Sequence, residues 1–325
     1  MELMVKKEIS EILTMLQDNG HTVQIGKILA PAVINILWEL TSGSRISRED
    51  PRLNQLLEFL NIRSKAFDMS GGTLTQYPWL RFIAPEKTGY SLIKKLNSNL
   101  KNLLLETITE HYETWAEGKN DDFIYSFITE MKKSNGNKTT FTEDQLIMVC
   151  LDIFIAGSQT TSNTLDFAFL MMILYPDIQN KVQACLDQAF SQTQEINYTD
   201  RLRVPYVEAV LMEVERYCHV TPICGPRRVL QDTSLEGYYI PKDTTILISL
   251  YSVHNDKNYW ADPGKRRCLG EILARNCIFL FFTEVIRKYE IAVLPGTKKP
   301  TGKPLPGISL SPEDYRAQFT PRVVS

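Results

Sequence analysis

The longest hydrophobic pattern in the chain spans residues 141–175 and predicts its central helix. Two apolar runs, residues 146–157 and 165–175, flank a polar centre over residues 158–164. Because apolar residues occupy every face of the two runs, we expect this helix to be buried nearly all round. A polar centre in such a helix indicates that a ligand, a cofactor or water lies beside it. Its hydroxyl side chains are expected to bond back to carbonyl groups of the preceding turn.

The ends of this helix carry their own signals. Thr142 is a typical N-terminal cap, and Pro176 ends the helix at its other end. A membrane-spanning helix is the alternative interpretation. Asp152, Asp166 and the polar centre argue against it, because neither apolar run reaches the ~18 residues that a span needs.

Shorter patterns with helical period fill most of the remaining chain. They predict helices over 1–16, 28–40, 47–67, 91–117, 123–131, 177–190, 205–217 and 269–289, with an irregular connection over 71–79. After Pro226 the pattern changes to short strands over 228–230, 237–241 and 244–248, and the Pro/Gly-rich tail from Pro295 is expected to form hairpins. No repeat or linker divides the chain. We therefore expect one domain over residues 1–325, mainly α with a small β part.

Composition and charge narrow the class of protein. An apolar share of 43% with 23% charged residues is typical of a soluble globular protein, and a net charge of −2 gives no reason to expect nucleic acid as a partner. The six cysteines include no Cys-x-x-Cys pair, and no His cluster has zinc-site spacing. Several cysteines lie in apolar helical patterns, which favours free thiols and a reducing compartment. The first residues predict neither a signal peptide nor a membrane anchor.

Two stretches could carry chemistry. Glu213 and Arg216 lie one turn apart on a helix, where a solvated ion pair contributes only ~0.2–0.5 kcal/mol. Cys268 stands where the next helix begins, so unpaired backbone N–H groups and the helix dipole would favour a thiolate there. Arg266 and Arg267 add positive charge beside it. The alternative for this second stretch is a basic surface turn with an incidental Cys.

Taken in order, three stretches resemble the motifs of the cytochrome P-450 family, the haem-thiolate monooxygenases. Ala156-Gly157-Ser158-Gln159-Thr160-Thr161 resembles the oxygen-binding motif of its central helix. Glu213-x-x-Arg216 resembles its Glu-x-x-Arg motif, and Gly264-x-Arg266-x-Cys268-x-Gly270 resembles half of its haem-binding loop. Residues 232–263 continue the likeness, which covers essentially the whole chain and is closest to insect members of microsomal type. The implied fold is an incomplete cytochrome P-450 fold.

The resemblance implies a role for each matching residue near the iron. Cys268 would be the axial thiolate ligand of haem iron, a ligand that favours O–O cleavage. Thr160 would help deliver protons to dioxygen. Gln159 stands where the family usually has a carboxylate, so water would have to complete the proton relay. Ala156 and Gly157 would leave room for dioxygen.

The resemblance also assigns residues that hold the cofactor and the fold. Arg266 and Arg227 would contact haem propionates, while Gly264 and Gly270 would let the flat haem approach the backbone. Residues 220–223 would line the substrate pocket. Glu213 and Arg216 would have a structural role behind the haem.

The implied function is insertion of one oxygen atom of O2 into an apolar small molecule. The implied cofactor is haem, with NADPH used indirectly through an NADPH-dependent cytochrome P-450 reductase as partner. Family members of this type work at the cytosolic face of the endoplasmic reticulum membrane. Without an anchor, this chain is expected to be either soluble or aggregated.

Departures from the family define a second hypothesis. Pro263 runs directly into Gly264, where the family has a few dozen further residues, among them an Arg that joins Glu213 and Arg216 in a network. The chain also begins where the family's third or fourth long helix begins. A buried ionic network that lacks one member is costly. The second hypothesis is therefore a truncated, non-catalytic remnant that binds haem poorly or not at all.

Overall fold

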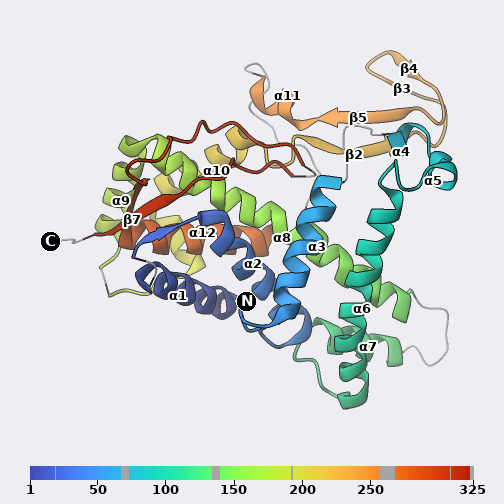
Figure 1. Cartoon of the computed structure of the whole chain (residues 1–325), viewed down its shortest axis with the longest axis horizontal. Helices are drawn as coiled ribbons and strands as arrows, with labels where there is room; N and C mark the ends of the chain where they lie inside the picture. The colour runs from blue at the N-terminus through green and yellow to red at the C-terminus, as the bar shows by residue number, and fades with distance from the viewer. Residues whose placement is uncertain are drawn as a thin grey trace.

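The computed structural model describes residues 1–18, 20–66, 73–133, 140–191, 193–256, 268–307 and 309–322. Helices pack around one long central helix, α8, and short strands lie at the periphery (Figure 1). The expected class, mainly α with a small β part, is confirmed.

The described helices are α1 (Glu2–Asp18), α2 (Ile25–Ser42), α3 (Pro51–Ala66), α4 (Thr73–Gln76), α5 (Leu80–Ile83), α6 (Tyr90–Thr114), α7 (Phe123–Lys133), α8 (Glu143–Leu174), α9 (Pro176–Ala189), the 3-10 helix η1 (Tyr198–Arg203), α10 (Pro205–Cys218), α11 (Leu250–Asn255) and α12 (Glu271–Lys288). The described strands are β1 (Thr22–Val23), β2 (Ile223–Arg228), β3 (Thr233–Leu235), β4 (Tyr238–Ile240), β5 (Thr245–Ser249), β6 (Tyr289–Val293) and β7 (Ala317–Pro321).

Helix α8 begins and ends close to where its sequence predicts. The Thr142 side chain accepts a hydrogen bond from the Gln145 N–H at 3.2 Å, which caps the first turn. Pro176 begins the next helix instead of extending this one. The expectation of burial on every side is wrong for the first half, where Met148 and Ala156 are exposed. One face of α8 is therefore open to solvent.

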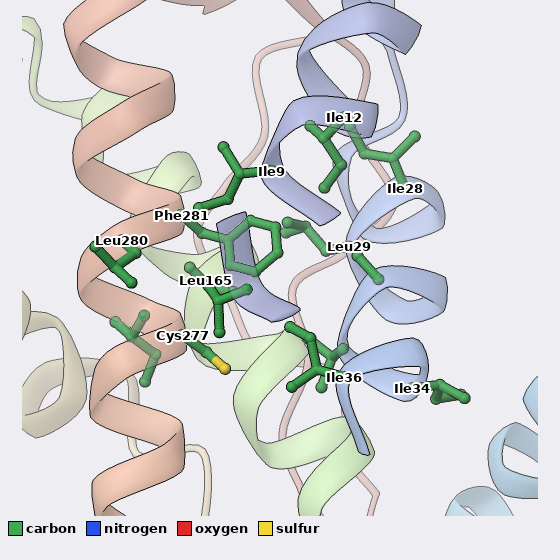
Figure 2. Close-up of a cluster of buried hydrophobic side chains, with 14 of the residues drawn as sticks. Ile9, Ile12, Ile28, Leu29, Ile34, Ile36, Leu165, Cys277, Leu280 and Phe281 are labelled. Carbon is green, nitrogen blue, oxygen red and sulfur yellow. The ribbon is translucent and has the colours of Figure 1, made fainter. Parts of the chain in front are cut away.

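The main hydrophobic core lies where α1, α2, α8 and α12 meet (Figure 2). Phe281 of α12 points toward Ile9 of α1 and Leu29 of α2, with Leu165 of α8 beside them, and all four side chains are at most 3% exposed. Among the described residues, α2 alone is long and apolar enough to cross a membrane. Because 67% of this helix is buried inside the protein, packing in the core accounts for its apolar composition.

The strands form three small antiparallel sheets, ordered β1-β7-β6, β2-β5 and β3-β4. Strands β4 and β5 confirm two of the predicted strands, whereas β2 precedes the predicted 228–230 and runs through Pro226. The pairing of β2 with β5 shifts between Cys224 and Arg227, and a bulge of this kind tolerates a residue without an N–H. The sequence did not predict α11 or the pairing of β7 with β1.

Buried polar side chains join elements that are far apart in sequence. The Gln179 amide of α9 donates to the Met172 carbonyl at 3.1 Å and to the Ile291 carbonyl at 2.9 Å, and it accepts from the Ile291 N–H at 2.7 Å. A buried amide with these partners satisfies the backbone in the middle of β6. Gln179 therefore fixes α9 against the sheet.

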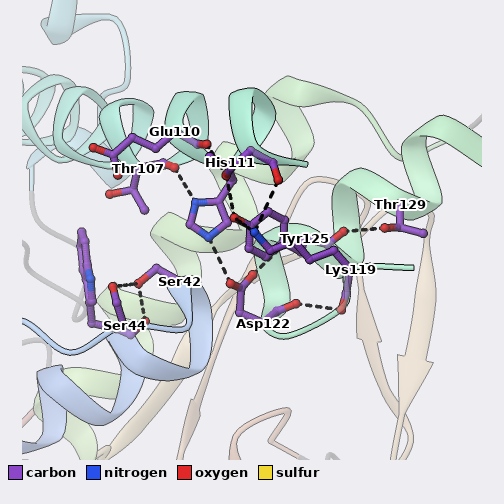
Figure 3. Close-up of polar contacts among 12 residues, drawn as sticks. Ser42, Ser44, Thr107, Glu110, His111, Lys119, Asp122, Tyr125 and Thr129 are labelled. Atoms are coloured by element: carbon purple, nitrogen blue, oxygen red, sulfur yellow. Dashed lines mark hydrogen bonds and ion pairs between the residues drawn. The ribbon is translucent and has the colours of Figure 1, made fainter. Parts of the chain in front are cut away.

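A second buried polar group joins α6 to α7 (Figure 3). The His111 ring lies 2.7 Å from the Thr107 carbonyl oxygen and 3.1 Å from Asp122 Oδ2. Asp122 Oδ1 accepts a hydrogen bond from the Tyr125 N–H at 2.8 Å and so caps α7. Both side chains are buried, and their contacts are internal to the fold.

Candidate functional site

The open face of α8 carries the polar centre that the sequence marks. Ala156 is exposed, and Gly157 and Thr160 are partly exposed. The Thr160 hydroxyl donates to the Ala156 carbonyl at 2.7 Å, and Ser162 and Thr164 make the same bond to the residue four before them, both at 2.8 Å. The expected back-bonding is confirmed, and the helix remains α-helical throughout. Thr160 therefore lies on an accessible surface with its hydroxyl hydrogen engaged in its own helix.

Gln159 points in a different direction from Thr160. Its amide nitrogen donates to the Leu60 carbonyl of α3 at 3.3 Å. The side chain thereby links the polar centre of α8 to the helix that crosses over it (Figure 1). This contact joins residues 99 positions apart, so no local pattern could predict it.

Cys268 differs from the other cysteines in its exposure. All six are free, and burial raises the thiol pKa of Cys150, Cys218 and Cys277 to about 12. Cys185 and Cys224 are partly buried, whereas Cys268 is exposed and lies just before α12. Of the six, Cys268 is therefore the accessible donor for a metal. Gly270 follows it as the N-cap of α12.

Two predicted haem-loop residues, Gly264 and Arg266, lie outside the described residues, as does the junction between Pro263 and Gly264. In the part of the chain that the structure describes, no group of three or more His, Cys, Asp or Glu side chains could hold a metal ion. Cys268 itself offers one accessible thiolate donor. This donor set fits a haem with one protein thiolate.

Glu213 and Arg216 of α10 form the expected pair. Arg216 Nε donates to Glu213 Oε2 at 2.7 Å, and this bond lowers the pKa of the Glu213 carboxyl. Arg216 also donates to the His254 carbonyl of α11 at 3.0 Å. The Glu213 side chain is 53% exposed, which agrees with the solvated pair expected from the spacing and differs from the buried network that the family resemblance implies. Because solvent reaches the Glu213 carboxylate, the lack of the family's third charged partner costs less free energy than it would in a buried network.

Arg227 is exposed on β2, away from any contact with α8 that the structure records. The segment just before this strand is held against the C-terminal tail, because the Val220 carbonyl accepts from the Leu310 N–H at 2.8 Å. Asn163 of α8 donates to the Leu310 carbonyl at 2.9 Å, which brings the same tail onto the central helix. Sequence analysis did not identify Asn163 as a contact residue.

A buried carboxyl further along α8 was also not identified as part of a site. The Tyr315 hydroxyl donates to Asp166 Oδ1 at 2.7 Å, and the two residues line a cavity of about 570 Å³ with Gly26. Burial raises the pKa of Asp166 from 3.8 to about 7. A Cβ at position 26 would lie 2.8 Å from Asp166 Oδ2, so glycine is needed there. The available sequence signal was a polar residue every seven positions, at Asp152, Gln159 and Asp166.

Comparison with known proteins gives consistent matches. The cytochrome P450 family model matches residues 1–263 and 264–319. The chain is 42% identical to "Probable cytochrome P450 305a1" of Drosophila melanogaster, covering 99% of this chain and 71% of the relative. It is 33% identical to the farnesoate epoxidase of Bombyx mori, covering 94% and 67%. A zebra fish cytochrome P450 structure with progesterone matches with a TM-score of 0.85 and 28% identity, covering 98% of this chain and 77% of that one.

These matches also give information on the junction between Pro263 and Gly264. The family match is divided between Pro263 and Gly264. The alignment with the Drosophila relative is 358 positions long, which exceeds the 325 residues of this chain by 33. The relative thus has at least that many residues without a counterpart here, in agreement with an internal deletion of a few dozen residues.

Proposed function

The chain belongs to the cytochrome P450 family, and on this premise we propose that it inserts one oxygen atom of O2 into an apolar small molecule. Family members are haem-thiolate monooxygenases that receive electrons from NADPH through a redox partner. The observation that carries the proposal is the exposed Cys268 before α12, the accessible thiol among the described residues. It agrees with the open face of α8 at Ala156 and Thr160.

We assign the roles of residues as follows. Cys268 would hold the haem iron through its thiolate, and a bound haem would supply the activation of dioxygen. Thr160 would act from the space beside the exposed Ala156, whereas the position of a Cβ on Gly157 lies against Leu37 of α2. Its hydroxyl hydrogen is engaged by the Ala156 carbonyl, so water would have to help Thr160 deliver a proton. Gln159 holds α3 in place over that space.

The remaining assignments support the cofactor and the fold. Gly264, Arg266, Gly270 and Arg227 would contact the haem or its propionates. Glu213 and Arg216 hold α10 against α11, in agreement with the bond from Arg216 to the His254 carbonyl. The proposed electron donor is an NADPH-dependent cytochrome P-450 reductase.

A second candidate function is favoured by the junction at Pro263. The residues missing there include the partner expected for Glu213 and Arg216, and the family match is divided at this position. The candidate is a non-catalytic member of the family that binds haem poorly or not at all.

The carbon-monoxide difference spectrum of the reduced chain, expressed with a haem precursor, distinguishes the two candidates. We expect a Soret band at the thiolate-ligated position, lost completely in Cys268→Ala because no other exposed thiol can replace it. Cys185→Ala, which removes a partly buried thiol, is the matched control and should keep the band. A flat spectrum, or one that Cys268→Ala leaves unchanged, would favour the non-catalytic candidate.

We further propose that the chain works at the endoplasmic reticulum membrane, on its cytosolic face. An apolar patch on and beside α5 supports contact with the bilayer surface. Its members are 52–75% exposed: Tyr77, Trp79, Phe82 and Ile83. The patch lies at the outer edge of the molecule, beside the start of α6 (Figure 1). Aromatic and aliphatic side chains exposed together in this way are typical of a membrane-facing surface.

Replacing Trp79, Phe82 and Ile83 together with Ser should weaken binding to phosphatidylcholine vesicles by at least about tenfold. Burying one such side chain in an apolar phase is worth ~1.5–3 kcal/mol, so the loss of three is readily measured by vesicle flotation. Leu202→Ser, at another side chain that is 78% exposed, is the control. Equal flotation of all three proteins would contradict the proposed membrane contact.

A further inference from the structure

Arg63 lies on the helix that crosses the open face of α8. The Leu60 carbonyl, three residues earlier on α3, accepts the hydrogen bond from Gln159, which fixes this part of α3 over the polar centre. Asp152 acts electrostatically on Arg63 from two turns before Gln159 on α8. Asp152, Ala156 and Gln159 are spaced four and three residues apart, so they share one face of α8. Arg63 therefore lies over the face that contains the exposed Ala156.

The guanidinium of Arg63 is half-buried, and none of the described carboxylates pairs with it. Its Nε donates to Asn97 Oδ1 of α6 at 3.2 Å, and it forms no ion pair within the described ranges. Burial lowers its pKa, and the distant Asp152 compensates only in part. A guanidinium carries five donors in a planar fork, and this neutral contact uses one of them.

Comparison with the other arginines shows that this situation is unusual in the chain. Six arginines among the described residues are buried or partly buried. The other five each lie within 3.5 Å of a carboxylate oxygen: Arg48, Arg201, Arg216, Arg287 and Arg322. The fold thus pairs its desolvated arginines, except the one over the open face of α8.

We propose that Arg63 binds the carboxylate of an apolar carboxylic acid that lies over Ala156 and Thr160, and so selects acids over neutral esters. The inference rests on the proposed function, because it takes this face of α8 as the substrate site. A carboxylate matches the guanidinium fork with two parallel hydrogen bonds, and a half-buried position strengthens each of them. The apolar part of the ligand would lie along the open face of the helix.

The test compares dodecanoate with methyl dodecanoate, two probes that differ in the charge of one end. Calorimetry on the whole chain at neutral pH gives both dissociation constants without any turnover. We expect the acid to bind roughly tenfold to 100-fold more tightly than the ester, the range that a hydrogen-bonded charge pair provides. Arg63→Leu should abolish this preference by weakening the acid alone and leaving the ester within about twofold.

Two further variants define the role. Arg63→Lys keeps the charge but loses the planar fork, so it should keep part of the preference. Arg52→Leu, at an exposed arginine of the same helix that pairs with Asp50, should keep all of it. Equal binding of acid and ester by the unmodified chain would overturn the inference. So would an Arg63→Leu variant that weakens both ligands equally, or the absence of binding by either ligand.

These outcomes separate the inference from the proposed function. A chain that shows the thiolate spectrum but no preference for the acid would overturn the role of Arg63 alone. A chain with a flat spectrum that still selects the acid through Arg63 would overturn the monooxygenase and support an acid-binding site.

Discussion

Phe281→Ala should lower the free energy of unfolding by about 3–5 kcal/mol, the usual range for truncating a fully buried Phe. The ring is 0% exposed and projects from α12 between α1 and α2 (Figure 2). Its removal would leave a cavity at the point where three helices meet, and rigid helices cannot close such a cavity completely. Because a typical domain is stable by only about 5–15 kcal/mol, this single change would remove a large share of the total.

The measurement is the midpoint of urea unfolding, followed by circular dichroism, for the variant and the unmodified chain. Phe82→Ala makes the same chemical change at a side chain that is 75% exposed, and it should alter the free energy of unfolding by less than about 0.5 kcal/mol. If the two variants shifted the midpoint equally, the core described here would be wrong.

Asp166→Asn should change how stability depends on pH. In the folded chain, burial keeps the Asp166 carboxyl protonated up to a pKa of about 7, whereas its ordinary value is 3.8. Between those pH values the folded state binds more protons at this site than the unfolded state. The free energy of unfolding therefore falls as pH rises from about 4 to about 7, and the contribution of Asp166 is constant above that.

The size of this effect follows from the difference in pKa. About three pKa units correspond to roughly 4 kcal/mol at most. Asparagine is neutral at every pH and still offers an oxygen to the Tyr315 hydroxyl. We therefore expect the variant to match the unmodified chain at about pH 4 and below, and to be more stable than it by a few kcal/mol at pH 8.

Urea unfolding at pH 5, 6, 7 and 8 measures this difference directly. Asp152→Asn removes a carboxyl from the exposed part of the same helix and controls for the change in net charge. The idea fails if the curves of Asp166→Asn and the unmodified chain run parallel over this range. The interaction with Tyr315 would then be structural without being linked to protonation.

Patterns within a few turns of chain predicted much of the fold. The apolar period, the Thr142 cap and Pro176 located α8, because hydrophobic burial and end capping act between neighbouring residues. The spacing of Glu213 and Arg216 predicted their ion pair for the same reason. The ordered motifs around Ala156 and Cys268 identified the family, which the comparisons confirm.

Contacts between distant segments required the tertiary structure. The family motif placed Gln159 near the reacting oxygen. In the structure, the packing of α3 directs its amide to the Leu60 carbonyl. Asp166 reaches Tyr315 across 149 positions, and this burial sets its pKa. The exposure of Glu213 likewise depends on which elements surround α10.

The sequence by itself determined the long helices, where the central helix begins and ends, and which family supplies the chemistry. Only the tertiary structure decided that Arg63, over an open face of α8, has no carboxylate partner among the residues that the structure describes. The physical reason is the range of the interactions. Backbone hydrogen bonds and amphipathic period are local, whereas desolvation and charge pairing depend on side chains that only the packed fold brings together.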